Sequence, residues 1–401
     1  MGDSAGASPG GAGAPGSGAS AAGDGLRRRR RRRLRYAGVA VAVLGVTAAG
    51  VGWVVYAKLS GNITADEAAA AELARYEKER PASLVRGARN VLVIGSDSRS
   101  GDDNGRYGRD TGTARSDTTI LLHLAAGRNS ATAVSVPRDL MVDVPGCRRR
   151  DGSRTEPVFT QFNYAFEAGG SACTIRTVEK LTGIRIDHHV VVDFQGFKRM
   201  VDALDGVEVC LRKPVDDEDA RLRLPAGRVT LDGEQALGYV RARKSLGDGS
   251  DTDRMDRQQR FLGALVDKVQ SNHVLLNPVK LYPVLDAATS SLTTDPGLAS
   301  LRGVYDLARG LRGIPAERVR FLTVPRKSYA RDVNRDQLVQ PDAEKLFTRL
   351  RTDEPVAVAA PAGRGTGGGD ESGSAAARGP GGGDSPEPTF SGNTAAEHVC
   401  E

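Results

Sequence analysis

The chain has 401 residues, of which 26% are charged, and a formal net charge of +6. Eight arginines lie between Arg27 and Arg35, so subtracting 8 from +6 leaves the rest of the chain at −2. A nucleic-acid-binding protein is expected to carry its positive charge on the folded domain. Because the excess is confined to one short run, the charge distribution argues against a nucleic-acid partner.

An uncharged apolar segment, residues 36–57, follows the arginine run directly. It is long enough to cross a bilayer, and longer than the apolar core of a cleavable signal peptide, which is the alternative interpretation. Trp53 and Tyr56 near its far end suit a membrane interface. Positive charges before the segment favour an N-terminus on the cytoplasmic side. The sequence therefore predicts a single-pass protein of the cell membrane with most of its chain extracytoplasmic.

Composition divides the chain into five segments. We expect a disordered basic cytoplasmic tail, a transmembrane helix, a juxtamembrane stalk, an extracytoplasmic globular domain and a disordered Gly/Pro-rich tail. Their predicted bounds are 1–35, 36–57, 58–87, 88–352 and 353–401. Within the stalk, a run rich in Ala and Glu predicts a short helix that ends at Pro81.

The globular segment alternates apolar runs with helical patterns. Short apolar runs predict strands at 90–94, 118–125, 131–136, 188–194, 206–211 and 318–324. Helical patterns occupy 174–181, 194–204, 275–287 and 296–311. Such alternation predicts an α/β fold, an α/β/α sandwich around a central mixed, mostly buried sheet, preceded by one transmembrane helix.

The stretch 234–262 concentrates arginines around a Gly/Ser/Asp loop. Ser250 or Asp251 is a candidate N-cap for the helix that follows the loop. Guanidinium groups and helix N-termini both bind phosphate oxygens, so the stretch is a candidate site for a phosphate-rich ligand. The alternative is a basic surface helix preceded by a flexible loop. The candidate ligands here are Arg241, Arg243, Asp251, Arg254 and Gln258.

Three more charged residues are candidates for the same site. Asp97 follows the first predicted strand and Asp117 precedes the second, so an intervening turn would place both at one end of the sheet. Two carboxylates near phosphates can hold Mg²⁺. Arg138, just beyond the third strand, would face the same point. Taken singly, an aspartate at a strand end is usually a turn-former, and a Pro-Arg-Asp sequence at a strand end is often just a surface turn.

Four cysteines, Cys147, Cys173, Cys210 and Cys400, lie on the predicted outer side of the membrane. None has C-x-x-C spacing, and the histidines form no zinc-binding pattern with them. An oxidising exterior favours two disulfides with three possible connectivities, and buried free thiols are the alternative.

Five motifs occur in a fixed order: GSDSR (95–99), RSDTT (115–119), SVPRD (135–139), FNYAFEAGG (162–170) and YVRAR…GDGSDTDRMDRQQ (239–259). Together they resemble the LytR-CpsA-Psr family over residues 90–324, and the Ala/Gly/Arg-rich composition hints at an actinobacterial member. The resemblance implies a membrane-anchored transferase of cell-wall assembly. Such enzymes move a glycopolymer from a polyprenyl-diphosphate carrier to a muramic acid hydroxyl of peptidoglycan, forming a phosphodiester, and a diphosphate-hydrolysing side activity is compatible with this chemistry.

The same resemblance assigns roles to residues. Asp97 and Asp117 match an acidic pair near Mg²⁺, with Asp97 as candidate base, and Arg138 matches a catalytic arginine. The implied diphosphate-binding set is Arg115, Arg241, Arg243, Asp251, Arg254 and Gln258. One departure is Gln161, which stands where many members have a lysine. A second is the loop between Arg243 and Asp251, which is one residue longer than in some relatives.

Two other functions fit parts of the pattern. A non-enzymatic membrane receptor or regulator would bind the lipid-linked precursor and signal through the anchor. However, the cytoplasmic segment is too short and too poor in bulky apolar residues for a DNA-binding domain. A structural wall-tethering protein would not need Asp97 and Asp117 to converge.

Overall fold

The computed structural model describes residues 20–97, 116–242, 251–270, 278–359 and 389–397, and the chain forms two compact units, Met1–Lys58 and Leu59–Glu401. Helix α1 (Ser20–Asn62) contains a stretch, Arg33–Asn62, that is apolar and long enough to cross a membrane. The predicted span lies inside this stretch. Contrary to the expectation of disorder up to residue 35, the helix begins at Ser20, because a run of arginines is a good helix former.

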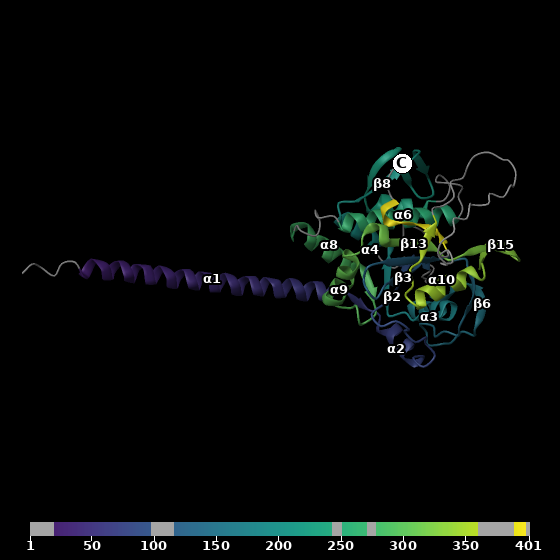
Figure 1. The fold of residues 1–401 in the computed structure, drawn as a ribbon, viewed down its shortest axis with the longest axis horizontal. Coiled ribbons are helices and arrows are strands. Elements are labelled where there is room, and N and C mark those ends of the chain that lie inside the picture. The colour runs from purple at the N-terminus through teal and green to yellow at the C-terminus, as the bar shows by residue number, and fades with distance from the viewer. Residues whose placement is uncertain (1–19, 98–115, 243–250, 271–277, 360–388, 398–401) are drawn as a thin grey trace, which may run out of the picture. The chain divides into compact units, whose positions relative to one another are not determined.

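The second unit is built on a mixed sheet that has nine strands within the described residues (Figure 1). In sheet order the strands are β1 (Thr64–Ala65), β12 (Leu292–Thr294), β7 (His188–Asp193), β2 (Arg89–Ser96), β3 (Ser116–Leu124), β4 (Ala131–Val136), β13 (Val319–Thr323), β17 (Thr389–Thr394) and β16 (Ala357–Ala359). The β2–β7, β4–β13, β1–β12 and β16–β17 pairs are parallel, and the other pairs are antiparallel.

Helices cover both faces of this sheet. On one face lie α2 (Glu67–Arg75), α3 (Tyr164–Thr182) and α10 (Asp342–Arg351), packed against strand residues such as Leu92, Ile94 and Leu121. On the other face α6 (Asp251–Gln270) and α9 (Leu301–Arg312) contact Ile120 and Phe321. The three layers confirm the predicted α/β/α sandwich.

A smaller core lies beside the face covered by α6. It joins α4 (Phe194–Ala203), α5 (Gly233–Arg241) and α6 to two hairpins, in which β8 (Val207–Leu211) pairs with β11 (Gly227–Leu231) and β9 (Val215–Asp217) pairs with β10 (Leu222–Leu224). Phe261 is buried at its centre. The remaining elements are α8 (Pro278–Ser291), the hairpins β5 (Met141–Val144) with β6 (Val158–Gln161) and β14 (Arg326–Tyr329) with β15 (Asp332–Leu338), and the 3₁₀ turns η2 (Ala316–Arg318) and η3 (Ala395–Glu397).

Two segments that the sequence places outside the domain belong to it. In the predicted stalk, β1 pairs with β12, and α2 buries Ala69 and Leu73 against the core because its apolar residues recur at helical spacing. In the predicted disordered tail, β17 pairs with β13 and buries Phe390. The Gly/Pro content that favours disorder is concentrated in 360–388, outside the described residues.

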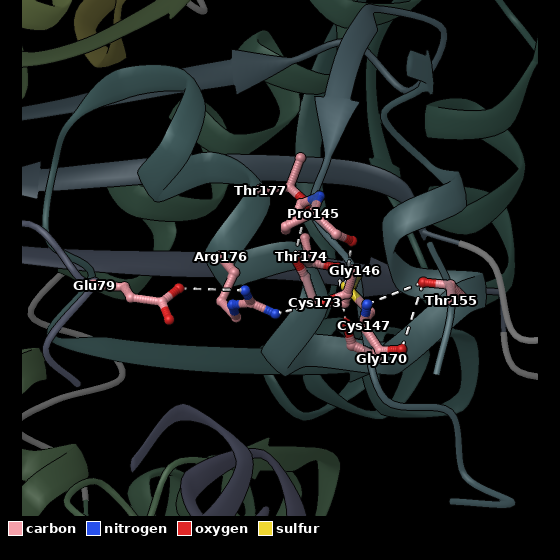
Figure 2. Close-up of a disulfide and its surroundings, with 10 residues drawn as sticks. All are labelled: Glu79, Pro145, Gly146, Cys147, Thr155, Gly170, Cys173, Thr174, Arg176 and Thr177. Atoms are coloured by element: carbon pink, nitrogen blue, oxygen red, sulfur yellow. Dashed lines mark hydrogen bonds and ion pairs between the residues drawn. A yellow bond between two sulfur atoms is a disulfide. The ribbon is translucent and has the colours of Figure 1, made fainter. Parts of the chain in front are cut away.

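A disulfide between Cys147 and Cys173 joins the loop after β5 to α3 (Figure 2). Helix α3 is kinked beside it, where Gly170 has a φ of 62° that side chains rarely adopt. A Cβ on Gly169 would lie 2.9 Å from the Cys173 Cβ, so the close approach of loop and helix requires glycine there. Cys210 lies in β8, and Cys400 lies outside the described residues.

Candidate active site

A pocket of about 580 Å³ opens where β2, β4 and β7 end and β3 begins. Ligands of α/β proteins usually bind at such strand ends. The sheet end contributes Ser96, Asp117, Arg138 and Asp193. Helices α4, α5 and α6 form the opposite wall together with Asp217 and Asp219 of the β9–β10 hairpin. Charged groups from distant motifs therefore meet apolar side chains from the smaller core.

Arg138 and Asp117 form an ion pair at the edge of this pocket. The Arg138 Nη1 donates to the Asp117 Oδ1 over 3.0 Å. Both side chains remain partly accessible, at 25% and 36% exposure. The pair is therefore oriented by the fold but still open to a ligand.

A second layer of contacts fixes Arg138. Its Nε donates to the Asp139 Oδ2 at 3.1 Å, and the Arg335 Nη1 donates to the Asp139 Oδ1 at 2.7 Å. The backbone N–H of Asn163 donates to the Arg138 carbonyl at 3.0 Å. Asp139 therefore bridges two guanidinium groups and sets the direction in which Arg138 points.

Gln161 contributes to the same arrangement. With its amide oriented to satisfy its neighbours, its side-chain oxygen accepts from the Arg335 Nε at 3.2 Å and Nη2 at 2.7 Å. The resemblance to the family implies a lysine at position 161, and Arg335 of β15 supplies a cation beside Gln161 here. No motif signals this role, because Arg335 is 196 residues from its partner Asp139.

The arginine stretch supplies the opposite wall. Arg241 is the last residue of α5, and its guanidinium lies 4.7 Å from the centroid of the Phe194 ring. Arg254, near the start of α6, lines the pocket although only 8% of the residue is exposed. Gln258 lines it as well, and its Nε2 donates to the Val240 carbonyl at 3.1 Å.

Arg257 has a different role from its neighbours. Its side chain donates to the Ala242 carbonyl just beyond α5, and burial lowers the pKa of this guanidinium. It therefore ties α6 to α5 and does not line the pocket.

The structure places the remaining predicted residues as follows. Asp97 directly follows β2, and because Ser96 pairs with Ser116, Asp97 and Asp117 lie at the same end of the sheet. Helix α6 begins at Asp251. Arg115 and Arg243, and the side chain of Asp251, lie outside the described residues.

The carboxylates at this end of the sheet fit a hard divalent cation by their chemistry. Mg²⁺ needs one or two carboxylates and completes its six-fold coordination with water and phosphate oxygens. Asp117 presents a partly exposed carboxylate to the pocket, and Asp97 follows the neighbouring strand. These two residues are the candidates for holding the ion.

Apolar side chains make up most of the helical wall, and the sequence motifs identify none of them. This wall is formed by Phe194, Phe197, Met200, Leu237, Val240, Phe261, Leu262 and Leu265. Their spacing is indistinguishable from that of core residues, and only the tertiary structure separates the residues that face the pocket from those that fill the core. The pocket thus combines an apolar wall with a polar end.

Comparison with known proteins identifies the family. The model described as LytR_cpsA_psr family matches residues 55–352. The cell wall biosynthesis proteins LcpB and LcpA of Corynebacterium glutamicum are 38% and 33% identical, over 65% and 71% of this chain and 61% and 58% of their own lengths. The match thus spans roughly three-fifths of each relative. TagT of Bacillus subtilis, named a polyisoprenyl-teichoic acid–peptidoglycan teichoic acid transferase, is 30% identical over 56% of this chain and 65% of its own.

Solved structures show the same fold. The LytR-Csp2A-Psr enzyme from Actinomyces oris has a TM-score of 0.53 at 22% identity and covers 68% of this chain and 93% of that chain. The structure of TagT bound to LI-WTA has a TM-score of 0.51 at 25% identity, covering 69% and 96%. Because the family model covers most of the globular unit, including every described site residue, this chain belongs to the LytR-CpsA-Psr family.

Proposed function

We propose that this protein is a phosphotransferase that moves a glycopolymer from a polyprenyl-diphosphate carrier to a muramic acid hydroxyl of peptidoglycan. The observation that carries the proposal is a single pocket in which an apolar wall leads to Arg138, Arg241, Arg254 and Asp117. An amphipathic ligand with a long apolar chain and a multiply charged head matches this arrangement. The names of the relatives, which include teichoic acid transferases, support the same chemistry.

The donor would bind with its two ends in different environments. The apolar wall formed by α4, α5 and α6 would cover the first part of the polyprenyl chain and remove it from water. Arg241 and Arg254 would bind the diphosphate, and the burial of Arg254 strengthens its electrostatic attraction by lowering the local dielectric constant.

In the reaction, the acceptor hydroxyl oxygen forms a bond to the phosphorus that bears the sugar polymer. The bond from this phosphorus to the bridging oxygen breaks, and polyprenyl phosphate leaves with the electron pair. Negative charge grows on the leaving oxygens, and Arg138, held by Asp139, is positioned to stabilise it. Asp97 is our candidate to accept the hydroxyl proton.

Mg²⁺ would be held by Asp117 and Asp97 together with phosphate oxygens. When bound, it supplies a positive charge that neutralises the diphosphate. The ion pair with Arg138 keeps the Asp117 carboxylate at the edge of the pocket, where it could contact the ion.

We also propose that α1 anchors the chain in the cell membrane with the globular unit on the extracytoplasmic side. The Cys147–Cys173 disulfide supports this side, since disulfides persist in oxidising compartments. The length and apolar composition of Arg33–Asn62 support the anchor.

The test uses the full chain in detergent with Mg²⁺, a polyprenyl-diphosphate-linked disaccharide as donor and a peptidoglycan oligosaccharide as acceptor. Arg138→Ala should reduce kcat on the order of 10²- to 10³-fold, as expected for a preorganised group that stabilises transition-state charge. Donor binding should change little, because Arg241 and Arg254 remain. Arg302→Ala, at an exposed position on α9, is the control and should leave turnover unchanged.

Two results would contradict the proposal. Full activity of Arg138→Ala would remove the assigned catalytic role. Tight donor binding by the wild-type chain without any transfer or hydrolysis would instead indicate the receptor that the sequence left as an alternative.

A further inference from the structure

A second pocket, of about 740 Å³, lies next to the first and differs from it in character. Polar and charged side chains dominate its lining, including Arg75, Arg148, Arg149, Arg150 and Arg199. We call it the polar pocket, and we call the pocket described above the apolar pocket. Both are lined by Ser96 and Asp193, the last residues of β2 and β7.

The two pockets lie on opposite faces of the sheet. Side chains alternate between faces along a strand, and Val192 lines the apolar pocket whereas Val191 lines the polar one. Helices α4, α5 and α6 border the apolar pocket, whereas α2 and α3 border most of the polar pocket, to which α4 adds Arg199 and the end of α8 adds Ser290 and Ser291. The pockets therefore meet around the strand ends and α4, and the reacting phosphorus would lie at the strand ends.

The disulfide anchors the backbone segment that carries three of the arginines of the polar pocket. Arg148, Arg149 and Arg150 directly follow Cys147, which is bonded to Cys173 of α3 (Figure 2). The hairpin-like loop is also held by the Thr155 N–H, which donates to the Cys147 carbonyl at 2.8 Å. A covalent link to the wall of the pocket thus anchors the backbone segment from which these three exposed arginines extend.

Three carboxylates line the same pocket. The Glu72 Oε2 pairs with the Arg75 Nη1 at 3.4 Å, whereas the Glu72 Oε1 is buried without a hydrogen-bond partner among the described residues. Asp66 accepts from the hydroxyl of Ser171 and lies 3.3 Å from the His189 Nε2. The Asp193 Oδ1 accepts from the N–H of Gly196. Among the described residues no ion pair involves Arg149 or Arg150, and both residues are exposed, so a ligand can reach them. The adjacent carboxylate is that of the exposed Asp151, whose pKa is lowered chiefly by hydrogen bonds from Ser153 and in smaller part by the charge of Arg149.

We propose that the polar pocket binds the acceptor, a peptidoglycan glycan strand, and that Arg149 and Arg150 contact the carboxylates of its stem peptide. The proposal rests on the phosphotransferase function proposed above. In phosphoryl transfer the attacking and leaving oxygens lie roughly in line with the phosphorus. Since the leaving polyprenyl phosphate occupies the apolar pocket, the acceptor hydroxyl must approach from the opposite side, where the polar pocket lies.

The ligand chemistry matches this position. A glycan strand presents hydroxyls and amides, which suit a pocket lined by Ser171, Ser290, Ser291 and Thr293. Guanidinium groups bind carboxylates two oxygens at a time, and arginines on an exposed rim favour recognition of the charged peptide over the sugar.

The test uses the full chain in detergent and the double variant Arg149→Gln/Arg150→Gln. Binding of a peptidoglycan tetrasaccharide with free stem-peptide carboxylates is measured directly, as is its KM in the transfer assay. The variant should raise both the Kd and the KM about tenfold and leave kcat and donor affinity unchanged. The same tetrasaccharide with its carboxylates amidated should bind the wild type about as weakly as the acidic form binds the variant. The matched control is Arg302→Gln/Arg309→Gln, two exposed arginines of α9.

Unchanged binding of the acidic tetrasaccharide to the double variant would overturn the proposal. So would a loss of donor affinity with unchanged acceptor affinity, because it would place the donor's sugar chain in the polar pocket. If the wild type transfers nothing, the proposed function fails, but the direct binding measurement still decides whether the polar pocket recognises the acidic glycan.

Discussion

The apolar and polar pockets flank the same strand ends and contrast in almost every property. In the apolar pocket a buried guanidinium, that of Arg254, stands at the end of an apolar wall. In the polar pocket the guanidinium groups of Arg149 and Arg150 lie exposed on a rim. Charges in a low-dielectric environment interact strongly and are little screened by salt, whereas exposed charges interact weakly.

This contrast follows from the alternation of side chains along β2 and β7. One strand presents different residues to the two faces, so a single sheet end can border an apolar environment and a polar one. The proposed lipid-linked donor and the proposed glycan acceptor would then share only the strand ends and α4. The comparison predicts that changes in one pocket leave the affinity of the other unaffected.

The largest effect is expected from a polar group in the apolar wall. Leu262→Gln places an amide where the polyprenyl chain would lie, and burying an unpaired amide costs about 1–3 kcal/mol. The Kd for the lipid-linked donor should rise roughly tenfold to a hundredfold, and acceptor affinity should stay constant. Leu84→Gln, at a leucine that is 65% exposed, is the control. A parallel loss of acceptor affinity would show that the pockets are coupled.

A second prediction concerns stability on the polar side. Burial raises the pKa of Asp66, but hydrogen bonds from His189 and Ser171 outweigh it and lower the pKa from 3.8 to about 2. Because the folded-state pKa is depressed, the stabilisation is complete above pH 4 and is lost as the pH falls towards 2. The difference corresponds to about 2 kcal/mol.

Asp66→Asn should therefore lower the free energy of unfolding at pH 6 and flatten its decline between pH 4 and 2. Chemical unfolding of the full chain in detergent, followed by circular dichroism, measures both. Asp306→Asn, at an exposed aspartate of α9, should preserve the slope. A slope in Asp66→Asn as steep as in the wild type would show that other groups cause the acid sensitivity.

The contrast also shows what the sequence can predict. The sheet and its charged strand ends follow from short apolar runs with Asp117 and Arg138 beside them, because local patterns encode them. The apolar wall cannot be predicted in this way, since Leu262 and Phe261 have the same helical pattern whether they face a ligand or the core. The strand that buries Phe390 is missed because a short segment after a Gly/Pro-rich stretch becomes ordered only through its pairing with β13.

Arg335 is the clearest case of a site residue that only long-range structure identifies. Its substitution is expected to have the smallest effect of the changes considered, and this effect is on kcat. Arg335→Gln removes the donor to the Asp139 Oδ1 and leaves Arg138 less firmly oriented. We expect kcat to fall about fivefold, close to the roughly 1 kcal/mol of one hydrogen bond, with KM for donor and acceptor nearly constant. Arg331→Gln, an exposed residue in the turn of the same hairpin, should have no effect.

If Arg335 acts through Asp139, then Asp139→Asn combined with Arg335→Gln should be no slower than Asp139→Asn alone. Arg335→Lys should recover part of the rate, because an ammonium group can still donate to the carboxylate. Additive losses in the double variant would mean that Arg335 acts independently of the Asp139–Arg138 pair. Since Arg335 contacts Asp139 and lines neither pocket, a change in the affinity for only one ligand would also contradict the positioning role.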